Sequence, residues 1–93
     1  MSMTDLPEAV PEFQLTVDAV GLACPLPILR AKKALATLAS GEILRVITTD
    51  RGAVRDFQAF CRQTGNELLG QIDEATIVTH YLKRRVKPAV SNP

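Results

Sequence analysis

The sequence lacks most of the residues on which metal sites and nucleic-acid surfaces are built. It has no tryptophan, aromatic residues make up 4% of the chain, and His80 is the only histidine. A single histidine argues against a zinc cluster, so we expect no metal, and we place His80 on the surface or at a sheet edge. Because no aromatic residues interleave with the basic residues of the C-terminal end, we expect no direct contact with nucleic acid.

Long apolar runs are also missing, and cysteine is scarce. No apolar stretch approaches the ~20 residues that span a bilayer. The first residues include Asp5, Glu8 and Glu12 and do not resemble a secretory signal. The two cysteines, Cys24 and Cys61, are therefore expected to be free thiols in a reducing compartment. We expect a cytoplasmic protein that binds neither a membrane nor a cofactor.

The residues that are present predict one domain. A chain of 93 residues, 46% hydrophobic and 23% charged, has the composition of an ordinary globular domain. Its net charge of +1 hides an asymmetry, since residues 1–82 hold seven Lys or Arg against ten Asp or Glu and the basic residues that restore the balance follow. We predict a flexible leader over 1–12, a domain over 13–83 and a disordered basic tail over 84–93.

Hydrophobic periodicity predicts six elements in the order strand, helix, strand, helix, strand, strand. The expected strands cover 13–19, 42–49, 67–72 and 76–83, and the expected helices cover 25–40 and 50–64. Asp50 is the expected N-cap of the second helix, Gly65 is its expected end, and Asp73-Glu74 is the expected turn of a hairpin.

These elements predict an α/β (α+β) fold. A short strand–helix–strand unit leaves its two strands parallel, and the last two strands are close enough in sequence to pair antiparallel. Two helices then cover one face of a mixed four-stranded sheet. The expected architecture is a two-layer βαβαββ sandwich.

The segment Gly21-Leu-Ala-Cys-Pro-Leu-Pro27 joins the first strand to the first helix. If the helix begins at Pro25, Cys24 is its N-cap, and we expect the helix dipole to lower the pKa of the thiol modestly. Pro27 stands where a redox motif would place a resolving cysteine, so no neighbouring thiol can expel a group carried by Cys24. Cys24 is therefore predicted to be a reactive thiol that carries sulfur, with Gly21, Pro25 and Pro27 shaping its loop.

Two alternatives to a carrier are kept. One is a regulatory or protein-interaction module that keeps the fold without using the thiol. The other is a redox protein that uses Cys24 and Cys61. We expect Cys61 to pack in the core instead, because it falls in the apolar stripe of the second helix.

The residues around Cys24 also carry a resemblance to a known family. Val17-Asp-Ala-Val-Gly-Leu-Ala-Cys-Pro-Leu-Pro27, followed by Lys32-Lys-Ala-Leu35 and Gly41-Glu42, resembles the TusA or SirA-like sulfur carriers. The resemblance implies a βαβαββ sandwich in which Cys24 accepts a persulfide sulfur from a cysteine desulfurase or a rhodanese-like donor. It also implies delivery to a partner protein with a reactive cysteine, for tRNA 2-thiolation, sulfur oxidation or cofactor biosynthesis.

A docking surface is expected beside the thiol. The carboxyl ends of parallel strands share one edge of a sheet, which makes the two strand-to-helix junctions neighbours. Apolar side chains at the start of the first helix, with charged residues around them, have the anatomy of a small transient interface. The predicted docking residues are Leu26, Leu29, Lys32, Asp50, Arg51 and Arg55.

Overall fold

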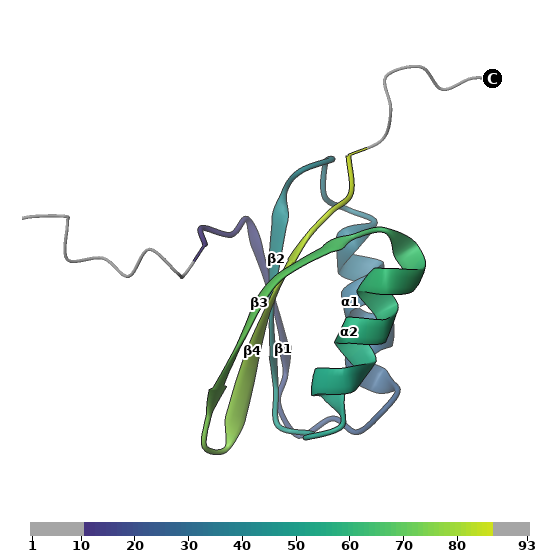
Figure 1. Cartoon of the computed structure of the whole chain (residues 1–93). Helices are drawn as coiled ribbons and strands as arrows, with labels where there is room; N and C mark the ends of the chain where they lie inside the picture. The colour runs from purple at the N-terminus through teal and green to yellow at the C-terminus, as the bar shows by residue number, and fades with distance from the viewer. Residues whose placement is uncertain (1–10, 87–93) are drawn as a thin grey trace, which may run out of the picture.

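The computed structural model describes residues 11–86, which form a sheet with two helices on one of its faces (Figure 1). Along the chain the elements are β1 (Leu15–Ala19), α1 (Leu26–Leu35), β2 (Ile43–Thr48), α2 (Ala53–Thr64), β3 (Glu67–Glu74) and β4 (Ile77–Lys83). The strand order is β1-β2-β4-β3, with β1 parallel to β2 and the other neighbours antiparallel. The predicted two-layer sandwich with a mixed sheet is confirmed.

The core lies between the sheet and the helices. Burial alternates along β2, which places Leu44 and Val46 fully inside, beside Leu82 of β4. Leu35 of α1 and Phe57 of α2 pack onto this layer. Burial of each such side chain contributes about 1.5–3 kcal/mol, so the apolar faces of the helices hold the two layers together.

Cys61 belongs to this core, as predicted. Its side chain is 6% exposed on the inner face of α2, and burial raises the pKa of its thiol to about 11. The helix ends at Gly65, also as predicted. Gly65 has a φ of 82°, and its N–H donates to the carbonyl of Cys61 at 2.9 Å. Glycine takes this left-handed conformation without the steric cost that other residues meet.

The end of α1 differs from the prediction, because the helix stops at Leu35 and not near residue 40. Beyond it the backbone tightens into shorter turns, in which Thr37 N–H donates to Ala34 and Leu38 N–H donates to Leu35. The guanidinium of Arg84 also donates to the carbonyls of Leu35 and Leu38. Partners far along the chain therefore satisfy carbonyls that a longer helix would have used itself.

The hairpin between β3 and β4 also differs from the prediction. Asp73 and Glu74 lie within β3, and the turn follows at Ala75, which has a φ of 61°. Asp73 stays in the strand because it pairs with Val78, and its carboxylate binds the guanidinium of Arg51. A shift in register near Leu68 and Gly70 inserts one extra residue into β3, which a simple alternating pattern does not anticipate.

Defined contacts extend past Lys83 into the predicted tail. The backbone of Arg84 is hydrogen-bonded to Gly41 and Glu42, at 2.9 and 2.8 Å. Arg85 N–H donates to the side-chain oxygen of Asn66 at 2.8 Å. Residues 87–93 of the predicted tail and residues 1–10 of the predicted leader lie outside the described part of the chain.

His80 is buried, so its expected place at the surface or an edge is wrong. It lies in β4, an inner strand, and its ring packs against Phe57 with 4.6 Å between ring centroids. The side-chain amide nitrogen of Gln71 lies 2.9 Å from Nδ1, and the Thr48 hydroxyl lies 2.8 Å from Nε2. Because an amide nitrogen only donates, Nδ1 accepts and Nε2 carries the hydrogen of the neutral ring. Burial lowers the pKa of His80 to about 4.

This histidine predicts a loss of stability in acid. Because the pKa is about 4 in the folded chain and ~6.5 in the unfolded chain, protons bind more tightly to the unfolded state. The contribution of neutral His80 is complete above pH 6.5 and falls as the pH drops, by about 3 kcal/mol at pH 4. Urea unfolding from pH 7 to pH 4 measures it. In His80→Gln this part of the pH dependence should vanish, and an equal slope in both proteins would contradict the prediction.

Candidate thiol site

The two strand-to-helix junctions meet at one edge of the sheet, at the bottom of Figure 1. Gly21 N–H donates to the Thr49 hydroxyl at 2.8 Å, and Cys24 N–H donates to Oδ2 of Asp50 at 2.8 Å. Gly21 has a φ of 82°, which lets the chain turn sharply out of β1. The predicted proximity of Cys24 and Asp50 is confirmed.

The expectation that Cys24 is the N-cap of α1 is wrong. The helix begins at Leu26, Pro25 occupies the N-cap position, and the Cys24–Pro25 peptide bond is cis. Leu26 N–H donates to the carbonyl of Ala23 at 2.9 Å, so this amide is already satisfied. Pro27 lies in the first turn, where it is buried and offers no N–H. The sulfur therefore sits before the helix and does not receive the capping interactions of its first turn.

The charge around the thiol is negative. The Asp56 carboxylate, in the first turn of α2, is the main cause that raises the pKa of the exposed Cys24 thiol, because it favours the protonated form. Desolvation and the negative charges of Asp56 and Asp50 add to this effect. The expected lowering of the Cys24 pKa is therefore wrong, because the carboxylates favour the protonated form.

Asp50 links the two junctions, although α2 begins after Gly52 and Asp50 is not its N-cap. One carboxylate oxygen accepts the Cys24 N–H, and the other accepts the Gly52 N–H at 3.0 Å. These two donors lower the pKa of Asp50, with the Cys24 bond the larger cause. The carboxylate closes a local turn before α2 and fixes the loop that presents Cys24.

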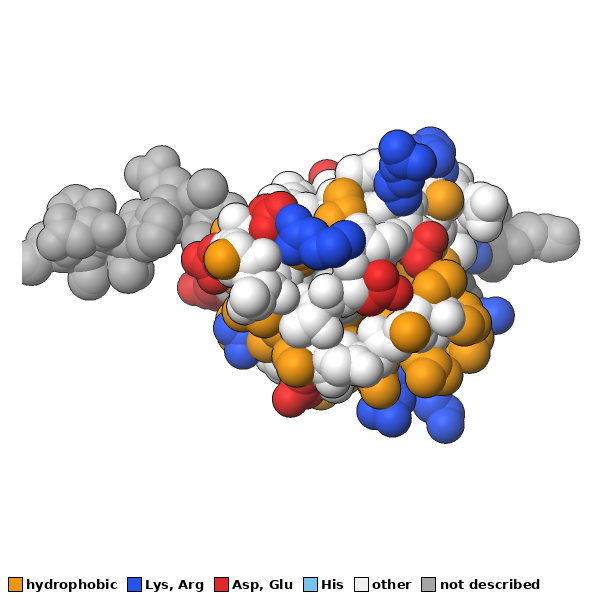
Figure 2. Space-filling model, turned by 90° about the horizontal axis from the view of Figure 1, so that it is seen from below, with side chains coloured by type: hydrophobic (Ala, Val, Ile, Leu, Met, Phe, Trp, Pro, Cys, Tyr) orange, Lys and Arg blue, Asp and Glu red, His pale blue; other side chains and the backbone are white. Residues whose placement is uncertain are grey.

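The predicted docking residues divide into two groups. Leu26 and Leu29 are 45% and 53% exposed and line a shallow groove along α1 with Lys32. Figure 2 views the edge that holds the junctions and shows acidic side chains next to an apolar patch with basic side chains at its rim. Arg51 is held by the β3–β4 hairpin, and Arg55 is exposed on α2. The structure thus gathers Leu26, Leu29 and Lys32 along α1, whereas the other three predicted residues come from the β2–α2 junction and from α2.

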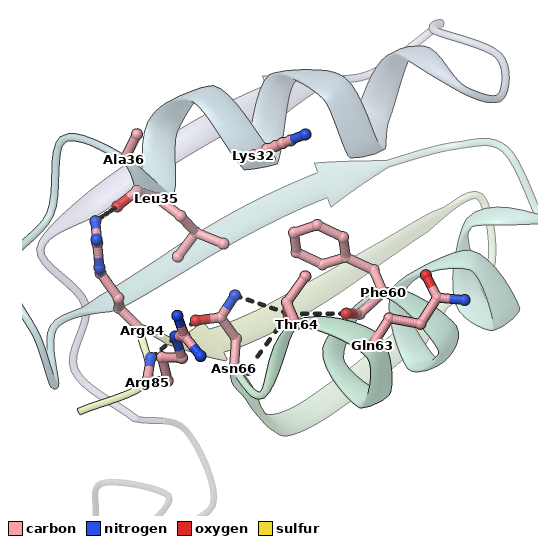
Figure 3. A pocket seen from close by; sticks show the side chains of 9 residues that line it. All are labelled: Lys32, Leu35, Ala36, Phe60, Gln63, Thr64, Asn66, Arg84 and Arg85. Atoms are coloured by element: carbon pink, nitrogen blue, oxygen red, sulfur yellow. Dashed lines mark hydrogen bonds between the residues drawn. The ribbon is translucent and has the colours of Figure 1, made fainter. Parts of the chain in front are cut away.

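Sequence reasoning missed Asp56 and a second groove. Asp56 could have been found, because an acidic residue in the first turn of the second helix faces the shared edge. The groove lies between the C-terminal halves of the helices, where Arg84 reaches the end of α1 (Figure 3). Its lining holds three cations and no carboxylate. It is lined by Lys32, Leu35, Ala36, Phe60, Gln63, Thr64, Asn66, Arg84 and Arg85.

Neither a metal cluster nor a membrane span is found in the described part of the chain. No three His, Cys, Asp or Glu residues in 11–86 are grouped so that they could hold a metal ion. Within the same range, no helix is long and apolar enough to cross a bilayer.

The structure presents one exposed thiol, Cys24, on a small βαβαββ sandwich, and the second cysteine is buried. The chain belongs to the TusA family, because the family model described as sulfurtransferase TusA matches residues 15–84. The family is one of sulfur carriers and establishes a general role in sulfur transfer.

Relatives and a solved structure agree with this assignment. The chain is 57% identical over 63 residues to a sulfur carrier protein TusA of Allochromatium vinosum, covering 68% of this chain and 83% of that protein. It is 56% identical over 70 residues to a putative sulfur carrier protein of Neisseria meningitidis, covering 75% and 95%. The crystal structure of a SirA-like protein from Desulfitobacterium hafniense superposes with a TM-score of 0.69 at 25% identity, covering 78% of this chain and all of that one.

The Asp50 link predicts a looser cysteine loop when its carboxylate is removed. In Asp50→Ala the Cys24 and Gly52 amides lose their acceptor. We expect both amides to exchange with deuterium about tenfold faster. Amide exchange followed by NMR measures this, and Asp50→Asn, which keeps one acceptor oxygen, should fall between the two proteins. Unchanged exchange at Cys24 in Asp50→Ala would refute the link.

Proposed function

We propose that Cys24 accepts a persulfide sulfur from a donor such as a cysteine desulfurase or a rhodanese, and relays it to a cysteine of a partner protein. The observation that carries the proposal is a free, exposed thiol at the shared edge of the junctions, with Pro27 in place of a resolving cysteine. Cys61 is buried in the core and offers no second thiol. A dithiol redox cycle is therefore unsupported.

The transfer is an exchange at sulfur. The Cys24 thiol loses its proton, and the thiolate attacks the outer sulfur of the donor persulfide. A sulfur–sulfur bond forms at Cys24 while the sulfur–sulfur bond of the donor breaks, and its electron pair leaves on the donor cysteine. That cysteine takes up a proton, so no external oxidant or reductant is consumed. The same exchange, with Cys24 now as the leaving group, delivers the sulfur to the acceptor.

The absence of a nearby thiol explains why a separate acceptor is needed. In a Cys-x-x-Cys motif the second cysteine would attack the persulfide and close a disulfide. Pro27 cannot do so, and the carried sulfur waits for a thiol of another protein. The acceptor can belong to tRNA 2-thiolation, sulfur oxidation or cofactor biosynthesis, which are the uses that the family resemblance implies.

The exposed apolar surface on α1 supports a docking role. Leu26 and Leu29 are about half exposed although they are large and apolar, and they lie within a few residues of Cys24. Lys32 borders them on the same helix. An apolar centre with a charged rim suits a transient complex that forms and dissociates at each transfer. Asp50, Arg51 and Arg55 complete the proposed docking set.

Sulfur loading is tested by intact-mass analysis after incubation with a cysteine desulfurase and cysteine. We expect an adduct of one sulfur atom that a reducing agent removes. Cys24→Ser should show no adduct, and Cys61→Ala, as the matched control, should load as the unchanged chain does. Equal loading of Cys24→Ser would refute the assignment. A Cys24→Ala variant that keeps its activity in cells would favour a regulatory module that does not use the thiol.

Docking is tested by Leu29→Asp. A charge in the apolar patch should raise the KM for the donor about tenfold, because a buried carboxylate at an interface is poorly solvated. The maximal rate of transfer should stay close to that of the unchanged chain. Leu69→Asp is the matched control, because Leu69 is 37% exposed on β3, outside the patch. A normal KM for Leu29→Asp, or an equal rise in the control, would exclude this patch.

A further inference from the structure

Two carboxylates, from Asp50 and Asp56, lie beside Cys24 and come from two different segments of the chain. Asp50 comes from the junction after β2 and accepts the backbone N–H of Cys24 at 2.8 Å, and Asp56 comes from the first turn of α2 and acts on the thiol. The two N–H donors on Asp50 stabilise its ionised form and lower its pKa, so this carboxylate is charged at neutral pH.

The basic residues near this edge do not neutralise the two carboxylates. Arg51 directs its guanidinium to the Asp73 carboxylate and to the carbonyl of Ala75. Arg55, which directly precedes Asp56, is exposed, and in residues 11–86 the Arg51–Asp73 contact is the only ion pair. The negative charge beside the thiol is therefore left for an outside group to pair with.

We propose that Asp50 and Asp56 form an electrostatic gate beside the Cys24 sulfur, which opens when a partner places Lys or Arg side chains against it. The inference rests on the proposed function and names the chemistry of the partner. The matching surface carries basic side chains around its own reactive sulfur, together with an apolar area that covers Leu26.

The gate follows from the chemistry of sulfur exchange. Only the thiolate attacks a persulfide, and a thiolate next to two carboxylates is disfavoured by like-charge repulsion. A partner cation pairs with the carboxylates and makes the thiolate easier to form at the moment of contact. Anionic small molecules are repelled from the same edge. The carrier then reacts selectively with a docked protein, and the carried sulfur is shielded in the same way.

Reagents of different charge test the gate without any sulfur donor. The full chain is treated at pH 7 and low salt with three methanethiosulfonates: the cationic trimethylammonioethyl, the neutral methyl and the anionic sulfonatoethyl reagent. The rate constant of each reagent with the protein is divided by the rate constant of the same reagent with 2-mercaptoethanol. We expect the cationic reagent to react faster with Cys24 than the anionic one. Asp56→Asn keeps the shape and an acceptor oxygen. It should lower the cation-to-anion ratio about three- to tenfold and speed the neutral reagent by a similar factor.

Glu67→Gln is the matched control, because Glu67 begins β3 at the opposite end of α2 from the thiol. It should leave the ratio and the neutral rate unchanged. An unchanged ratio and an unchanged neutral rate in folded Asp56→Asn would overturn the gate, even if Cys24 carries sulfur. Charge selectivity that depends on Asp56, in a chain that accepts no sulfur from any donor, would support the gate and contradict the proposed function.

Discussion

The Asp50 carboxylate is the interaction on which the arrangement of the site depends. It accepts one N–H from the cysteine loop and one from the turn before α2, and thereby joins two segments that are 26 residues apart in sequence. The parallel pairing of β1 and β2 brings these segments together, and the carboxylate fixes their relative position. The loop of Cys24 thus takes its shape from the sheet and from a side chain of the neighbouring junction more than from α1.

Much of the fold follows from the sequence, because it depends on patterns that every short segment displays. The alternation of β2 and the apolar stripe of α2 place Leu44, Val46 and Phe57 inside, as simple periodicity predicts. The boundaries that were missed depend on distant partners. Arg84 reaches back to the carbonyls of α1, and Arg51 holds Asp73 within β3. Local patterns contain no information about such contacts.

The site was predicted less completely than the fold, for a related reason. Cys24 and its prolines form a compact motif, so Cys24 could be singled out from the sequence, and the structure shows that it is exposed. The direction of its pKa shift depends on Asp56, which lies on another helix, and could not be read from the motif. His80 shows the same limit, because its burial follows from the position of β4 inside the sheet. Charge and burial at one residue are properties of the assembled layers.

The position of β4 in the sheet has a consequence for folding during synthesis. The strand comes last along the chain, yet it lies between β2 and β3, and Arg84 beyond it holds a carbonyl of Leu35, 49 residues earlier. During synthesis, β1 and β2 can pair while β3 has no neighbour. β4 can take its place between β2 and β3 only after residue 84 has left the ribosome. The four-stranded sheet is therefore completed late.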